Sequence, residues 1–125
     1  MEKKPSAAAL PHARPPYVPG TPEELDAVAA APENHEVLLQ NDRVRVLRVT
    51  IQPGEVEKKH THKWPGVFTI YRLPKIRYYD ENGNLCPPPA DLEEGKPFWI
   101  NPEGVHLVEN VGDRPLEAIR VELKD

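Results

Sequence analysis

The chain has 125 residues, enough for a single domain with one hydrophobic core. Its 16 Lys and Arg are outnumbered by 20 Asp and Glu, and this net charge of −4 argues against nucleic acid or an anionic membrane as a partner, because both attract basic surfaces. The single cysteine, Cys86, excludes an internal disulfide, and no apolar stretch is long enough for a signal peptide or a membrane span, so we expect a cytoplasmic protein.

Residues 1–20 contain five prolines and no hydrophobic periodicity, which is typical of an extended arm. The apolar side chains of Leu10, Tyr17 and Val18 favour an arm that docks on a surface, for instance that of a second subunit. Residues 21–35 are expected to form a short helix and a linker.

The helix is predicted over Pro22–Ala30. Thr21 is a suitable N-cap, Pro22 fits the first helical position, and Glu24 completes a capping box. The helix should end before Pro32, because the residue that precedes a proline disfavours the helical conformation.

Residues 36–125 have the pattern of an all-β domain, with eight or nine short strands and turn signals between them. This pattern indicates a sandwich or a small closed barrel, and Asn82-Gly83 is its clearest hairpin turn. The predicted strands are Glu36–Gln40, Arg43–Ile51, a histidine strand around residues 60–62, Gly66–Leu73, Lys75–Asp80, Phe98–Ile100, Val105–Val111 and Leu116–Leu123.

Two of these strands have informative faces. In Arg43–Ile51 the hydrophobic alternation changes phase near Leu47, which predicts a β-bulge there. In Leu116–Leu123 one face carries Ile119, Val121 and Leu123, and the other carries Arg120 and Glu122.

Three histidines point to a site. His60 and His62 stand one residue apart, so on a strand both imidazoles face the same side, as two ligands of one metal do. His106 follows a Pro-x-Gly turn on a later strand. We expect His35 to be a loop or strand-entry residue rather than a ligand, and His12 lies in the arm without an assigned role.

The order and spacing of these residues resemble the two sequence motifs of the cupin superfamily. The first motif is a glycine, five residues, His-x-His, three or four residues and a glutamate; its opening is matched by Gly54, His60 and His62. The second motif contains Pro-x-Gly, two residues, a histidine, three residues and an asparagine. Its counterparts, with one residue fewer before the histidine, are Pro102, Gly104, His106 and Asn110.

This resemblance covers residues 36–124 and implies a cupin jelly-roll barrel of two antiparallel sheets. The barrel, assigned to residues 36–125, would follow the short N-terminal helix and the extended Pro-rich arm. Cupins commonly form dimers, so the resemblance also implies a homodimer.

The glutamate of the first motif is missing, because positions 66 and 67 hold Gly66 and Val67. The resemblance therefore implies a variant of the cupin metal site with three histidines, His60, His62 and His106, as in some cupin-like dioxygenases. We expect a divalent transition metal, with Fe, Zn, Mn and Ni left open. Neutral ligands leave the full charge on the metal, which favours an anionic ligand in the open positions.

Further candidates depend on how the strand after the histidine pair faces. If Val67 points inward, Tyr71 shares its face and is a candidate catalytic acid. If Gly66 points inward, Arg72 does too and could bind a substrate carboxylate.

Other residues are candidate substrate contacts. Trp64 either lines the pocket or packs as a structural aromatic, Phe98 is a core residue that could also touch substrate, and Asn110 shares the face of His106. Glu109 should point away from His106 and is a poor substitute ligand, and Cys86, beside three prolines, is expected to be inert.

The function expected from these features is that of a small metal-dependent enzyme, dioxygenase-like, acting on a small organic acid or diketone. One alternative is a non-enzymatic module that binds or senses a small molecule with weak metal binding or none. A further alternative is a sugar isomerase or epimerase, which would need an acid–base pair for which only Tyr71 offers an acid.

Overall fold

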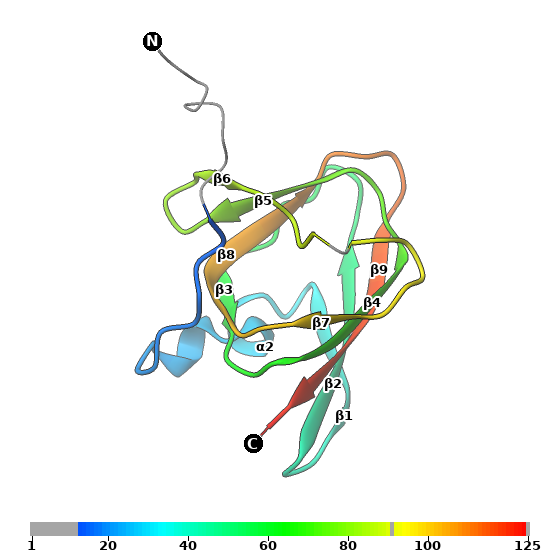
Figure 1. Ribbon diagram of the computed structural model, residues 1–125. Coiled ribbons are helices and arrows are strands. Elements are labelled where there is room, and N and C mark those ends of the chain that lie inside the picture. The colour runs from blue at the N-terminus through cyan, green and yellow to red at the C-terminus, as the bar shows by residue number, and fades with distance from the viewer. Residues whose placement is uncertain (1–12, 91, 125) are drawn as a thin grey trace.

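In the computed structural model, which describes residues 13–90 and 92–124, two antiparallel sheets face each other around one interior (Figure 1). The larger sheet has the strand order β1-β2-β9-β4-β7 and the smaller one β3-β8-β5-β6. The all-β barrel of two sheets that was predicted from the sequence is confirmed. Its strands are β1 (His35–Gln40), β2 (Val44–Ile51), β3 (His60–His62), β4 (Gly66–Arg72), β5 (Ile76–Asp80), β6 (Leu85–Cys86), β7 (Phe98–Ile100), β8 (Glu103–Asn110) and β9 (Leu116–Leu123).

The predicted helix over Pro22–Ala30 is wrong in extent. A 3-10 turn, η1 (Glu23–Leu25), and a single α-helical turn, α2 (Ala27–Ala30), take its place. Asp26 separates them with an extended backbone (ψ 145°), since its side chain accepts from the backbone N–H of Val28 at 3.1 Å and from Arg45 Nη1 at 2.8 Å. A buried ion pair thus outweighs local helix propensity.

In β2 every second residue faces the barrel interior along the whole strand, so the predicted change of hydrophobic phase near Leu47 is wrong. The bulge lies in the neighbouring strand: β1 pairs Val37 with Leu47 and Leu39 with Val46, which leaves Leu38 as the extra residue. The inward residues of β2 are Arg45, Leu47, Val49 and Ile51.

β9 turns its charged face inward. The pairing of β2 with β9 places Arg45 opposite Glu122 and Ile51 opposite Leu116. Side chains of opposite residues lie on the same face of a sheet, so one end of the barrel interior is charged and the other is apolar. The buried apolar end is formed by Val49, Ile51, Ile70, Phe98, Ile100, Leu116 and Ala118.

The described part of the arm, residues 13–20, runs along its own barrel. The backbone N–H of Gly104 donates to the carbonyl of Pro15 at 2.9 Å, and Pro16 bridges to Glu103 of β8. Leu10 and His12 lie outside the described residues. In the part of the chain that the structure describes, no helix is long and apolar enough to cross a membrane.

Candidate metal centre

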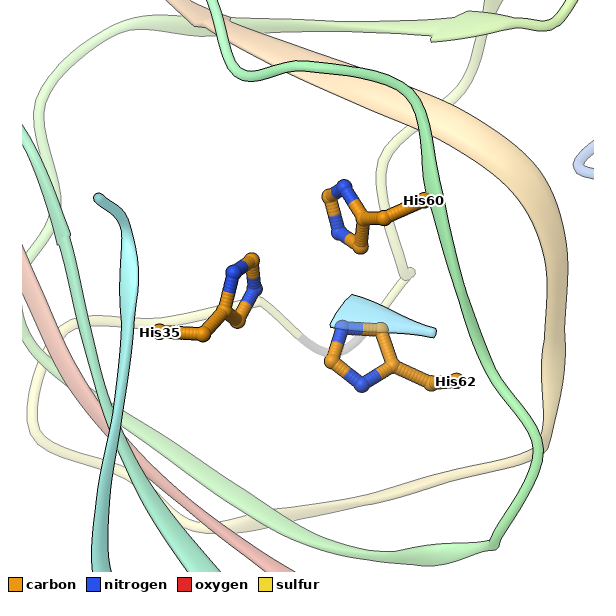
Figure 2. A group of neighbouring side chains, drawn as sticks. All are labelled: His35, His60 and His62. Atoms are coloured by element: carbon orange, nitrogen blue, oxygen red, sulfur yellow. The ribbon is translucent and has the colours of Figure 1, made fainter. Parts of the chain in front are cut away.

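Four histidines meet at the charged end of the barrel. His60 and His62 come from β3, His106 from β8 and His35 from the first position of β1, and each is only 1–3% exposed. Ring centroids are separated by 4.5 Å for His60 and His106 and by 4.6 Å for His35 and His60. Figure 2 shows the rings of His35, His60 and His62 turned toward one another.

His35 begins β1, which confirms it as a strand-entry residue, and the expectation that it is not a ligand stays a prediction. It pairs with Val49, whose side chain faces the barrel interior. Opposite residues of an antiparallel pair share a face, so the pairing turns the His35 ring toward the other three histidines.

Each of the four rings is oriented by a hydrogen bond at Nδ1. The acceptors are the carbonyl of Ala31 for His35 (3.0 Å), of Lys58 for His60 (2.8 Å) and of Gly104 for His106 (2.7 Å). A carbonyl oxygen can only accept, so Nδ1 carries the proton in these three rings and the lone pair is on Nε2. For His62 the partner is the Glu122 carboxyl at 2.7 Å.

The described residues contain two groups whose potential ligand atoms all lie within 4.8 Å of one another: His35, His60 and His62, and His62, Glu103 and His106. The three histidines of the sequence motifs are therefore gathered in one place but divided between the groups. His62 belongs to both. The predicted role of His60, His62 and His106 as ligands stays a prediction.

Carboxylates approach this cluster from positions other than the one in the motif. Glu57 Oε2 lies 3.6 Å from His35 Nε2, and Glu57 Oε1 lies 3.9 Å from His60 Nε2. Glu103 Oε1 lies 3.9 Å from His106 Nε2.

The motif position itself has no room for a glutamate. A Cβ on Gly66 would lie 1.8 Å from the carbonyl oxygen of Val121, because β4 and β9 approach closely there. Val67, the other possible position, is 38% exposed on the outside of the barrel. A carboxylate ligand therefore has to come from another part of the chain.

Burial keeps the imidazoles uncharged. It lowers the pKa of His35 to about 4 and the pKa values of His60 and His62 well below the ordinary value, and neighbouring cationic groups add to this for all three. Burial also lowers the pKa of His106, against the opposing effect of Glu103. Neutral imidazole is the form that binds metal.

The pKa values of the two carboxyl groups beside the histidines, Glu57 and Glu103, are shifted in opposite directions. Burial raises the pKa of Glu57 to about 8, so this group is protonated at neutral pH unless a cation joins it. Burial alone would also raise the pKa of Glu103, but His106 and the hydrogen-bonded Arg120 outweigh it and lower this pKa.

A second layer of contacts holds the cluster. Tyr78 stacks on His106 with 4.7 Å between ring centroids, and its hydroxyl donates to Glu103 at 2.9 Å. Arg120 Nη1 donates to the same carboxylate at 2.7 Å. Glu122, besides contacting His62, accepts from Arg45 Nε at 2.6 Å.

Tyr71 and Arg72 do not reach this site. β4 begins with Gly66 facing inward, so regular alternation would also turn Arg72 inward. The pairing of β4 with β9 is irregular between Ile70 and Arg72, however, and the alternation does not continue to Arg72. Arg72 therefore pairs with Glu117 at the surface at 2.8 Å, and Tyr71 is 55% exposed. The structure thus places the proposed catalytic tyrosine and the proposed carboxylate-binding arginine outside the cavity.

The other predicted contacts divide between the cavity and the surrounding structure. Phe98 lines the cavity.

Trp64 is not among the residues that line the cavity, and its ring contacts three cationic side chains, those of Arg45, Lys63 and Lys124. The Nζ of Lys63 lies 4.8 Å from its ring centroid. Asn110 is fully buried, and its amide donates to the carbonyls of Ile51 and Arg114 at 2.9 and 2.8 Å, which is a structural role. The Glu109 carboxylate binds the Tyr79 hydroxyl at 3.0 Å, and Cys86 is a buried free thiol.

Some residues of the site were not predicted from the sequence. A signal existed for Arg120 and Glu122, because they share the phase of Leu116 and Ala118 and would face inward with them. The residues without a predicted role in the site are Glu57, Tyr78, Glu103, Arg120 and Glu122.

A cavity of about 60 Å³ joins the histidines to the apolar end of the barrel. One water needs about 10–15 Å³ on this measure, so the space suits an ion with a small ligand. Its walls on the side away from the histidines are apolar, and include Phe68, Ile70, Phe98, Ile100 and Leu116.

No protein-family model and no curated protein matches the chain, whereas solved structures do. A cupin domain from Bordetella pertussis Tohama I is similar with a TM-score of 0.60 and 18% identity, over 91% of this chain and 99% of that one. An RmlC-like cupin family protein from Methanocaldococcus jannaschii has a TM-score of 0.54 and 18% identity, over 71% and 77% of the two chains. The polyketide cyclase RemF from Streptomyces resistomycificus has a TM-score of 0.53 and 15% identity, over 80% and 72%. At these identities the likeness establishes the fold.

Proposed function

Starting from its cupin fold, we propose that this protein is a metal-dependent enzyme that acts on a small organic acid or diketone. The observation that carries the proposal is the common orientation of the histidines. Three Nδ1–H groups donate to backbone carbonyls, which leaves the Nε2 lone pairs free at the cavity. Metal-binding histidines are oriented by this kind of outer hydrogen bond.

The donor set fits a divalent transition metal. His35, His60 and His62 would supply imidazole nitrogens, and the Glu57 carboxyl lies beside two of them. Imidazole suits Zn, Fe and Ni, and a carboxylate also suits Mn. When bound, such an ion would supply Lewis acidity to an oxygen of the substrate.

The protein contributes a dry and shaped surrounding for that chemistry. The apolar wall around Phe68, Ile70 and Phe98 excludes water and accommodates the carbon skeleton of a small substrate. Tyr78 and Arg120 hold Glu103 beside His106, and the ring of His106 is fixed by the Gly104 carbonyl and by stacking on Tyr78. These features favour a dioxygenase-type reaction, with dioxygen as the co-substrate, over a reaction of sugars, whose hydroxyl groups need polar partners along the wall.

A non-enzymatic binding module is the second candidate. The small size of the cavity, about 60 Å³, is the observation that favours it, because a bound molecule would leave little space for a co-substrate. Oxygen consumption by the metal-loaded protein in the presence of small organic acids or acetylacetone separates the two candidates.

Metal content tests the proposal directly. We expect wild-type protein, dialysed after exposure to Fe, Zn, Mn or Ni, to retain about one equivalent of metal by elemental analysis. His62 belongs to both groups of potential ligands, so His62→Ala should weaken metal affinity by at least about 10-fold.

The matched control is His12→Ala, which removes the one histidine of the chain without an assigned role and should leave metal content unchanged. Wild-type protein that retains no metal from any of the four solutions would contradict the proposal. Metal retention without oxygen consumption would instead favour the binding module.

A further inference from the structure

One buried arginine beside the histidines has nitrogens without a hydrogen-bond partner. Arg120 is 2% exposed and lines the cavity. Its Nη1 donates to Glu103, but Nε and Nη2 are buried and make no hydrogen bond within the described residues. Buried charged donors without acceptors are costly, so a native site normally supplies an acceptor for them.

These two nitrogens form a single edge of the guanidinium group. The N–H of Nε and one N–H of Nη2 project from the same side in parallel, and this fork matches the two oxygens of a carboxylate. Glu122 does not fill it. The Oε2 atom of Glu122 lies 3.6 Å from Arg120 Nε, beyond hydrogen-bond distance, and contacts His62 Nδ1 at 2.7 Å instead.

The position of Arg120 along β9 decides what else a bound carboxylate would meet. The residue lies between inward Ala118, at the apolar end of the barrel, and Glu122, at the charged end. Its Cζ lies 5.3 Å from the ring centroid of Phe68, which also lines the cavity. An acid bound at Arg120 would therefore have apolar walls for its carbon chain and the histidines near its carboxylate.

We propose that Arg120 is the carboxylate-binding residue of this site and that the substrate is a small organic acid with an apolar tail, not a neutral diketone. This inference rests on the proposed function, because it identifies the bound acid with the substrate of the metal centre. It gives to Arg120 the role that the sequence suggested for Arg72.

Calorimetric titration with small probes tests the proposal in both metal-free and zinc-loaded protein. The probes are isovalerate, its neutral amide isovaleramide, and the neutral diketone acetylacetone. We expect isovalerate to bind at least about 10-fold more tightly than either neutral probe, as expected for hydrogen bonds to charged groups.

Arg120→Lys keeps the positive charge beside Glu103 but removes the two-nitrogen fork. It should weaken isovalerate binding by about 10-fold or more while leaving zinc content at the wild-type level. Arg72→Lys is the matched control, because it makes the same change in a surface ion pair and should leave isovalerate binding unchanged.

Equal binding of isovalerate and isovaleramide by the wild type would overturn the proposal, and this comparison does not depend on any variant folding. Unchanged isovalerate affinity in folded Arg120→Lys would overturn it as well. If zinc binds and no preference for the acid exists, this inference fails while the metal centre stands. If the acid preference requires Arg120 and no metal binds, the carboxylate site stands while the proposed metal-dependent function fails.

Discussion

At the scale of single residues, the hydrogen bond at Nδ1 prepares each histidine for a ligand. The carbonyl partners of His35, His60 and His106 all belong to chain segments within four residues of the ring that they orient. The orientation is thus built into local backbone geometry and does not require the metal. Burial adds to this, because it keeps the rings uncharged.

The lowered pKa of His35, about 4, predicts a pH-dependent contribution to stability in metal-free protein. The unfolded chain binds a proton at this residue below a pH of about 6.5, and the folded chain does not until about 4, so protonation favours unfolding. The contribution of His35 to the free energy of unfolding should therefore be fully present above about pH 6.5. It should fall by about 2 kcal/mol between about pH 7 and about pH 5.

Urea unfolding of wild type and His35→Gln in the presence of EDTA measures this effect. The difference in unfolding free energy between the two proteins should change in favour of the variant as the pH falls. A difference that is the same at both pH values would show that His35 titrates normally in the folded protein.

At the scale of secondary-structure elements, the close approach of β4 to β9 explains why the motif glutamate is missing. Gly66 lies against the backbone of Val121, and the inward positions of β9 supply Arg120 and Glu122 to the site instead. The same sheet positions Arg45 opposite Glu122. Arg45 also donates two hydrogen bonds to Asp26, the residue that follows η1.

This contact predicts that Gly66→Ala is strongly destabilising. Its Cβ would lie 1.8 Å from the Val121 carbonyl oxygen, so the two strands would have to separate. We expect a loss of about 3 kcal/mol or more in the free energy of unfolding. Val67→Ala, on the exposed side of the same strand, is the matched control and should change stability by less than about 1 kcal/mol. A Gly66→Ala protein as stable as this control would disprove the close approach.

At the scale of the whole molecule, the described part of the N-terminal arm completes the barrel surface along β8. The Pro15 carbonyl accepts from the N–H of Gly104, and a Cβ on Gly104 would lie 2.5 Å from the carbonyl oxygen of Pro16. The sequence suggested that the arm docks, for instance on a second subunit; residues 13–16 dock on their own barrel. The homodimer implied by the cupin resemblance stays a prediction.

Deletion of residues 1–20 should therefore lower the melting temperature without changing the number of chains per particle. Losing the backbone contacts to β8 should cost about 1–2 kcal/mol, which corresponds to a decrease of roughly 5–10 °C. Differential scanning calorimetry and light scattering measure the two quantities. An unchanged melting temperature would show that the docked arm contributes nothing to stability, and a changed particle mass would show that the arm also joins subunits.

The sequence by itself determined the class of fold and three of the four clustered histidines. Period-two alternation with turn signals predicts antiparallel strands, and the spacing of His60, His62 and His106 matches the cupin motifs. These signals are local, because each depends on residues a few positions apart.

Only the tertiary structure decided which other side chains join the site. Alternation places Arg120 and Glu122 on the face of Leu116 and Ala118, which is a signal that they face inward. The opposite face carries Ile119, Val121 and Leu123, so alternation alone does not choose between the two faces. His35 and Glu57 reach the cluster through strand pairings and barrel closure between segments far apart in the chain. Buried charges likewise find their partners only in the folded chain, as Arg45 does with Asp26 and Glu122.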